Sequence, residues 1–119
     1  MPEPKPSKTA IYRKPLYSAV LEQAKKVGKV EIKEIVFQPS QKTGLHFHPC
    51  PVTGYILKGT AVLEIEGEAT QVLPAGSAFY EPAGARVRRF ENHSAVEEMI
   101  FTAFYLLDGE QNLIEMIKE

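Results

Sequence analysis

Short runs in which apolar and polar residues alternate dominate the chain from residue 30 onward. Alternation with a period of two is the pattern of a β-strand that buries one face, and these runs are rich in Val, Ile, Phe and Tyr. Gly, Pro, Asn or Ser separates one run from the next. The expected strands are 30–38, 54–58, 60–67, 70–73, 77–81, 86–91 and 96–107. Many short strands with frequent turns predict an all-β protein built as an antiparallel sandwich or barrel.

The two ends of the chain follow different patterns. Residues 1–15 are rich in proline and lysine, so we expect a flexible N-terminal arm. The apolar residues of segment 16–24 fall at helical spacing, which predicts a short helical or irregular segment before the first strand. Segment 110–119 also has apolar residues at helical spacing, but it follows an Asp108-Gly109 pair that suits a turn into a last strand. The sequence leaves both structures open there.

The composition is that of an ordinary globular protein. The chain has 119 residues, of which 44% are hydrophobic and 24% are charged, so we expect a single domain over residues 16–119. The formal net charge of −1 gives no general field for nucleic acid or for an anionic membrane surface. No segment approaches the roughly 20 apolar residues that span a bilayer, and the N-terminus lacks the apolar core of a signal peptide. With Cys50 as the single cysteine, these features favour a cytoplasmic protein without an internal disulfide.

The segment GLHFHPCPVTGYILKG, residues 44–59, contains the clearest candidate chemistry. Its two histidines, His46 and His48, are separated by one residue. On an extended chain their side chains point to the same side, because successive side chains alternate between the two faces. Two imidazoles that face one cavity form half of a metal site. Without a metal they would be polar pocket residues that hydrogen-bond to the backbone or to a ligand.

The same segment resembles the first motif of the cupin family, which combines a glycine, His-X-His, a downstream glutamate and a closing Tyr-(Val/Ile)-Leu-X-Gly. Segment 73–92, LPAGSAFYEPAGARVRRFEN, resembles the second cupin motif through Gly76, the Pro82-Ala83-Gly84 turn and Asn92. The resemblance covers roughly residues 30–107. It implies a small antiparallel jelly-roll β-barrel with the motif histidines at its mouth.

Two of the metal ligands that the resemblance implies are replaced in this chain. The glutamate of the first motif is expected four or five residues after His48, where the chain has Val52 and Thr53. The histidine of the second motif is expected three residues after Gly84, where the chain has Val87. Valine offers no ligand atom, so a complete family site would need a substitute.

One residue is inserted before Asn92, which leaves the register of segment 86–91 open. In the first register Val87 and Arg89 face the cavity. In the second register Arg86, Arg88 and Phe90 face the cavity and Arg88 takes the ligand position, because a slip by one residue exchanges the two faces of a strand. An arginine there would repel a cation and favour an anionic ligand.

Glu81 is the candidate substitute for a missing ligand. It precedes the Pro-Ala-Gly turn in a segment expected to run beside the strand of the first motif, and some cupin-like sequences share its Tyr-Glu-Pro context. Two imidazoles and one carboxylate would form a facial triad suited to Fe(II), Mn(II), Zn or Ni. Gln41 and His93 are weaker candidates. The alternative for Glu81 is a solvent-exposed residue at the edge of a strand.

Other residues are expected around the site. Tyr55 is a candidate catalytic acid, and Glu81 is a candidate catalytic base as well as a ligand. The expected substrate pocket contains Cys50, Phe79, Tyr80, Arg88 and Arg89. Simpler interpretations are an inert buried thiol, aromatic core or pocket wall, and a solvated basic face of a strand.

Three functions fit these residues. The first is a metal-dependent dioxygenase, isomerase or lyase acting on a small oxygenated substrate, with the metal as a Lewis acid or an O₂-binding ion. The second is a metal-free epimerase or isomerase in which His and Tyr transfer protons and Arg88 or Arg89 holds a carboxylate or phosphate. The third is a non-catalytic barrel that binds or senses a small molecule. The long apolar segment 96–107 leaves an edge to cover, so we also expect a homodimer.

Overall fold

The computed structural model describes residues 10–118. Within that range all helical or extended secondary-structure elements are β-strands. The strands are β1 (Lys29–Phe37), β2 (His46–Phe47), β3 (Val52–Lys58), β4 (Thr60–Ile65), β5 (Gln71–Pro74), β6 (Ala78–Glu81), β7 (Val87–Asn92), β8 (Met99–Leu107) and β9 (Glu115–Met116). All strands predicted from the alternation form, with ends shifted by a few residues. The additional strands, β2 and β9, are only two residues long.

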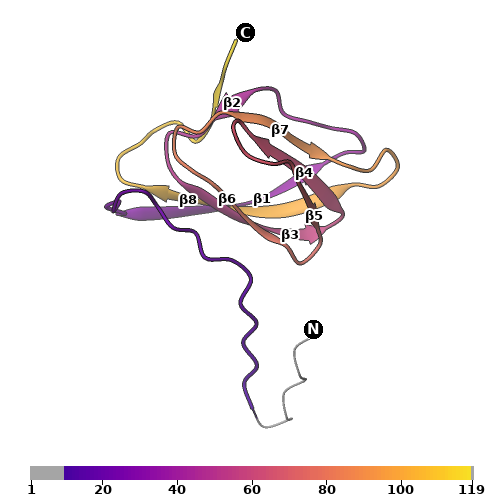
Figure 1. Cartoon of the computed structure of the whole chain (residues 1–119), viewed down its shortest axis with the longest axis horizontal. Helices are drawn as coiled ribbons and strands as arrows, with labels where there is room; N and C mark the ends of the chain where they lie inside the picture. The colour runs from indigo at the N-terminus through magenta and orange to yellow at the C-terminus, as the bar shows by residue number, and fades with distance from the viewer. Residues whose placement is uncertain (1–9, 119) are drawn as a thin grey trace.

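The strands form two antiparallel sheets that pack face to face (Figure 1). One sheet has the order β1-β8-β3-β6 and the other has the order β5-β4-β7-β2-β9. Sheet neighbours are often distant in sequence, since β1 pairs with β8 from Lys29–Leu107 to Phe37–Met99. This arrangement is the jelly-roll sandwich, and it confirms the predicted all-β fold.

Inward-facing side chains fill the space between the sheets. On β8 every second side chain is buried, namely Met99, Phe101, Ala103, Tyr105 and Leu107. Several phenylalanines from different strands meet in this interior with ring centroids between 4.8 and 6.2 Å apart, namely Phe37, Phe79, Phe90 and Phe101. Tilted and edge-on contacts of this kind add to the stabilisation that comes from burying the rings. The interior is therefore aromatic along much of its length.

A β-bulge in β7 accommodates the inserted residue of segment 86–91. Glu64 pairs with Arg89 and Ile65 pairs with Val87, so the ladder between β4 and β7 skips Arg88. The side chains of Arg88 and Arg89 are 44% and 45% exposed, whereas Val87 is fully buried. Each predicted register is correct for only part of the strand. Val87 faces the interior as in the first register and Phe90 as in the second, because the bulge between them turns two consecutive arginines outward.

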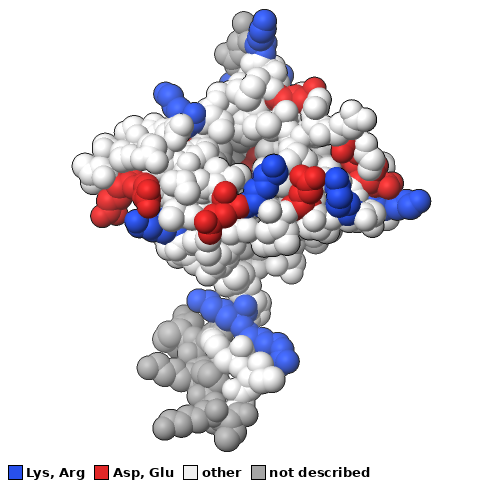
Figure 2. All heavy atoms as spheres, turned by 180° about the vertical axis from the view of Figure 1, so that it is seen from behind, with Lys and Arg blue, Asp and Glu red and all other residues white. Residues whose placement is uncertain are grey.

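The outward arginines lie within a belt of paired charges. Glu66 contacts Arg86 at 3.0 Å and Arg88 at 3.1 Å, and Arg89 contacts Glu91 at 2.7 Å. Elsewhere the charges are also mixed in sign, since Figure 2 shows blue and red side chains side by side on the face of the molecule seen from behind. The belt is balanced in sign, so it offers no concentrated positive surface to an anionic partner.

The structure at the two ends of the described chain can be compared with the predictions for segments 16–24 and 110–119. Segment 16–24 is irregular, which is one of the two structures predicted for it. Val20 is 81% exposed, so a helix here would have little buried apolar face to stabilise it. Of the predicted N-terminal arm, residues 1–9 lie outside the described residues. Segment 110–119 contributes a strand, β9, which pairs with β2. Within residues 10–118 no helix has the length and apolar character needed to cross a membrane.

Candidate metal centre

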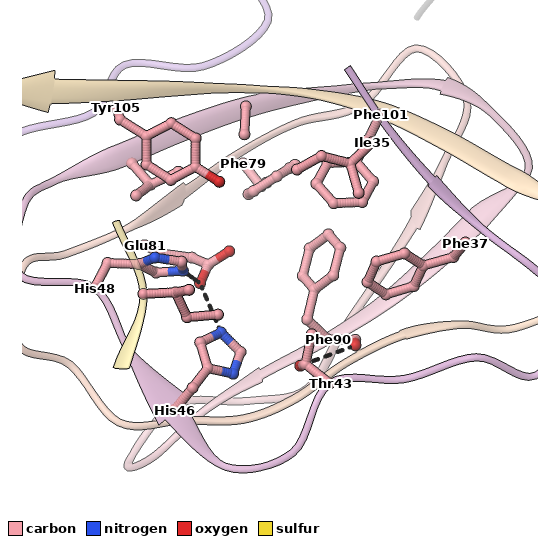
Figure 3. Close-up of a pocket in the computed structure, with 13 residues that line it drawn as sticks. Ile35, Phe37, Thr43, His46, His48, Phe79, Glu81, Phe90, Phe101 and Tyr105 are labelled. Atoms are coloured by element: carbon pink, nitrogen blue, oxygen red, sulfur yellow. Dashed lines mark hydrogen bonds and ion pairs between the residues drawn. The ribbon is translucent and has the colours of Figure 1, made fainter. Parts of the chain in front are cut away.

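Three buried side chains converge between the two sheets (Figure 3). His46 lies on β2, His48 follows that strand, and Glu81 is the last residue of β6. They are 2%, 6% and 4% exposed, respectively. One nitrogen or oxygen from each lies within 4.8 Å of the others, so a single ion between them could contact all three residues. The structure thus brings the predicted metal ligands together.

Each imidazole is held in place through its Nδ1 atom. His46 Nδ1–H donates to the Gly44 carbonyl at 2.8 Å, and His48 Nδ1–H donates to the Leu113 carbonyl at 2.7 Å. A carbonyl oxygen can only accept, so these bonds require the proton on Nδ1. They turn the Nε2 atoms of His46 and His48 toward Glu81 Oε2, at 3.7 and 3.0 Å. Metal-binding histidines are commonly oriented by such a bond on their second nitrogen, so these residues fit a divalent transition-metal ion.

Without a metal ion, a proton on His48 Nε2 makes an ion pair of His48 and Glu81. Burial alone would lower the pKa of His48, but its hydrogen bond to Glu81 and the charge of that carboxylate outweigh burial and raise the pKa. Burial alone would raise the pKa of Glu81, but the nearby imidazoles of His46 and His48, the second of which is hydrogen-bonded to it, lower that pKa. In the metal-free state both shifts favour a proton on His48 Nε2 that is donated to the Glu81 carboxylate. A metal ion would have to displace that proton.

Valines occupy the two positions where the family resemblance implied further ligands. Val52 lies opposite Glu81 across β3 and β6, and Val87 lies opposite His46 across β7 and β2. Both valines are at most 2% exposed. Within residues 10–118 this site therefore offers two imidazoles and one carboxylate, which would leave coordination positions for water or a small molecule.

The triad faces an apolar cavity of about 230 Å³, which we call the chamber. Its lining consists of Ile35, Phe37, Thr43, His46, His48, Val52, Phe79, Glu81, Phe90, Phe101, Ala103, Tyr105 and Ile114. Figure 3 shows the triad grouped on one side and the rings of Phe37 and Phe90 on the other. Gly54 makes room for the chamber wall, since a Cβ atom there would lie 2.1 Å from the Phe79 ring.

Tyr105 is a chamber residue that the sequence analysis missed. It is 7% exposed, and its ring centroid lies 6.1 Å from that of His48. Burial, followed by the negative charge of Glu81, raises the pKa of the Tyr105 hydroxyl, which therefore stays protonated. The alternation along β8 indicates which of its residues face inward, so Tyr105 could have been predicted from the sequence as an inward-facing residue.

The arginines and the catalytic tyrosine predicted for the pocket lie elsewhere. Arg88 and Arg89 point away from the chamber because of the bulge in β7. Tyr55 faces the outer side of its sheet, where it lines a shallow hollow together with Leu16 and Tyr17. Alternation on β3 explains this placement, because Gly54 and Ile56 take the inward positions. Tyr55 therefore lies outside the chamber that contains the triad.

The remaining candidates divide in the same way. Phe79 lines the chamber, as predicted for the pocket, whereas Tyr80 points outward into a hollow beside Leu21 and Lys25. Cys50 is fully buried in the core outside the chamber lining, and burial raises the pKa of its thiol. The weaker ligand candidates, Gln41 and His93, are both exposed.

Comparisons with known proteins agree with the fold. Residues 33–105 match a family model described as the cupin domain. A comparison with curated proteins gave no match. Among solved structures, the DMSP lyase DddQ from Ruegeria pomeroyi DSS-3 matches with a TM-score of 0.63 and 17% identity, over 73% of this chain and 42% of the lyase chain.

Two further structures give a similar result. A cupin-like protein from Thermotoga maritima matches with a TM-score of 0.63 and 17% identity, over 74% of this chain and 64% of that one. An oxalate oxidase in complex with the substrate analogue glycolate matches with a TM-score of 0.61 and 22% identity, over 74% of this chain and 46% of that one. The chain spans less than two thirds of each of these three proteins, and the likeness concerns the fold.

Proposed function

This chain belongs to the cupin domain family, and we propose that it binds one divalent transition-metal ion through His46, His48 and Glu81. The orientation of the two imidazoles carries this proposal. Both Nδ1 atoms are tied to backbone carbonyls, so both Nε2 atoms face the same carboxylate oxygen. Two buried imidazoles and a buried carboxylate in that arrangement suit Fe(II), Mn(II), Zn or Ni.

The proposed activity is the binding and activation of a small molecule in the chamber. A bound divalent ion acts as a Lewis acid toward an oxygen of that molecule. Glu81 offsets part of the charge of the ion, while the two histidines stay neutral ligands because their Nδ1 atoms hold the protons. The apolar walls restrict water, which strengthens electrostatic interactions inside the chamber.

The metal-free epimerase alternative loses support from the placement of two residues. It required Arg88 or Arg89 to hold a carboxylate or phosphate beside the histidines. Both arginines point away from the chamber and form ion pairs with exposed glutamates. A site without a metal would also have to tolerate the buried charge of Glu81 with His48 as its main partner.

Metal content tests the proposal directly. The protein is purified without chelator and without affinity nickel, and its metal content is measured alongside the His46→Ala/His48→Ala variant. We expect near-stoichiometric metal in the wild type and none in the double variant. His93→Ala is the matched control, because His93 is exposed and outside the triad, and it should retain the metal.

A failure to bind metal would contradict the proposal. If the wild-type protein takes up none of Fe(II), Mn(II), Zn(II) or Ni(II) in anaerobic titrations, the proposed function is wrong. Far-ultraviolet circular dichroism of each variant shows whether the fold is intact. Glu81→Gln provides a second variant in case the double alanine variant does not fold.

A further inference from the structure

The Tyr105 hydroxyl lies inside the chamber without a hydrogen-bond partner among residues 10–118. Its side chain is more than nine-tenths buried, because the residue is only 7% exposed. The polar groups around it are satisfied: His46 and His48 bond to carbonyls and Thr43 bonds to the Phe90 carbonyl. No fully enclosed side-chain nitrogen or oxygen in the described residues lacks a partner, so the Tyr105 oxygen must still be reachable from the chamber. A hydroxyl in that position is available to a ligand.

The hydroxyl and the triad face the same space. Tyr105, Val52 and Glu81 lie side by side on β8, β3 and β6, since Val52 pairs with both of the others. All three side chains are buried on the inner face of the sheet. Figure 3 shows the Tyr105 hydroxyl directed into the chamber above Glu81 and the histidines. A group bound at the triad would therefore lie near a second, independent hydrogen-bond donor.

The rest of the chamber limits what kind of molecule fits. Phenylalanine rings and aliphatic side chains form most of the wall, and no lysine or arginine of the described chain lines it. Hydroxyl-rich or dianionic molecules would leave polar groups without partners against this wall. The volume of about 230 Å³ exceeds the roughly 150 Å³ of an apolar protein cavity that binds benzene. One ring with a few additional atoms is therefore the appropriate size.

We propose that the chamber takes a small, apolar carbonyl compound whose oxygen is held by the Tyr105 hydroxyl. A carbonyl oxygen has two lone pairs, so it can accept from Tyr105 and face the metal at the same time. The apolar part of the molecule then lies against Phe79, Phe90 and Phe101. This inference rests on the proposed function only for the interaction with the ion, because the contacts with Tyr105 and the aromatic wall do not depend on it.

Binding of three probes tests the proposal. Acetophenone carries one ring and one carbonyl, ethylbenzene has the same shape without the oxygen, and malonate is small and dianionic. Their affinities are measured by calorimetry and ligand-observed NMR on zinc-loaded and metal-free protein. We expect acetophenone to bind the zinc-loaded protein about tenfold or more tightly than ethylbenzene, and malonate to bind more weakly than acetophenone.

Two variants separate the contributions of the hydroxyl and of the cavity. Tyr105→Phe should weaken acetophenone by about tenfold and leave ethylbenzene unchanged, while the outward-facing Tyr80→Phe should change neither. Ala103→Leu fills part of the chamber and should weaken both aromatic probes. Thr102→Leu, on the outer face of the same strand, is the matched control. Ile35→Phe is a second chamber-filling variant in case the first one does not fold.

The outcomes distinguish this inference from the proposed function. If metal binds but Tyr105→Phe leaves acetophenone unchanged, or if malonate binds more tightly than acetophenone, the ligand inference is wrong and the metal site stands. If no metal binds but acetophenone still depends on Tyr105 and ethylbenzene still depends on Ala103, the chamber inference stands without the metal. If neither acetophenone nor ethylbenzene binds to the zinc-loaded or to the metal-free protein, the inference is wrong.

Discussion

Val52 and Glu81 lie directly opposite each other on β3 and β6, with both side chains on the inner face of the sheet. The cupin motif implies a carboxylate at or beside the position of Val52. Here the only carboxylate in the buried group within residues 10–118 comes from the neighbouring strand, and it reaches the Nε2 atoms of both histidines. The proposed carboxylate ligand therefore comes from the strand next to the one on which the motif implies it.

Glu81→Gln is expected to weaken metal binding by roughly 10- to 100-fold or more, because it replaces a charged ligand with a neutral amide. Titration calorimetry with Zn(II) or Mn(II) measures the change. Glu68→Gln, at an exposed glutamate, is the matched control and should bind like the wild type. Equal affinities for Glu81→Gln and wild type would remove Glu81 from the site.

Val87→His is expected to increase metal affinity by about tenfold or more, because it adds an imidazole directly opposite His46. Since Val87 is fully buried, we also expect the metal-free variant to lose about 1–3 kcal/mol of stability. Calorimetry and urea unfolding measure the two effects. Val72→His, at a position 60% exposed, should leave metal affinity unchanged. An affinity for Val87→His no higher than that of the wild type would show that this position does not reach the ion.

The buried pair of His48 and Glu81 predicts a defined pH dependence for the metal-free protein. The pKa of His48 is raised above 6.5, so its contribution is fully present below pH 6.5 and is lost as pH rises through the raised value. The pKa of Glu81 is lowered below 4.5, so its contribution is present above pH 4.5 and is lost as pH falls through the lowered value. The pair should therefore stabilise the fold most between pH 4.5 and 6.5.

The free energy of unfolding in the presence of EDTA, measured against pH, checks this expectation. The difference between wild type and Glu81→Gln should be largest in that window and should shrink on both sides of it. The difference between wild type and Glu68→Gln should vary less with pH, because Glu68 is exposed. A difference for Glu81→Gln that does not change with pH would contradict the ion pair.

The sequence was sufficient for the fold and for most of the proposed metal site, because both depend on local patterns. Alternation located the long strands, and His-X-His on an extended chain placed two imidazoles on one side. The pairing of β2 with β9 was not predictable, since each has two residues and forms only through contacts between distant segments. The helical spacing of segment 16–24 did not decide between a helix and an irregular segment, because spacing alone does not show whether a buried surface is available.

The pocket was less predictable than its ligands. A single-residue insertion in a strand can either shift the whole strand or form a local bulge, and the sequence of one strand does not distinguish them. The bulge at Arg88 therefore moved both predicted arginines out of the pocket. Tyr105 faces inward by simple alternation, but its proximity to the triad depends on the pairing of β8 with β3.

Segment 96–107, which was expected to leave an edge, forms β8 between β1 and β3 and is not an edge strand. We therefore predict that the homodimer forms through the outer face of the sheet that contains β1. Val30, Ile32 and Val36 project from this face and are 48%, 62% and 43% exposed, and β1 is an edge strand of its sheet. A second copy of the chain would cover both the apolar side chains and the strand edge. Ile32→Glu should therefore shift the protein toward monomer in sedimentation velocity, while Val96→Glu should not. A monomeric wild type at micromolar concentration would refute the prediction.

The bond between His48 and the Leu113 carbonyl spans 65 positions of the chain, and Glu81 lies on yet another strand. An isolated peptide containing the 44–59 motif would hold both histidines and the Gly44 carbonyl, but neither the Leu113 carbonyl that orients His48 nor the Glu81 carboxylate. The proposed ligand set consequently forms only after these distant segments have docked. A metal ion would then select the completed fold over any partly folded intermediate, and removing it would loosen the segment around Leu113 first.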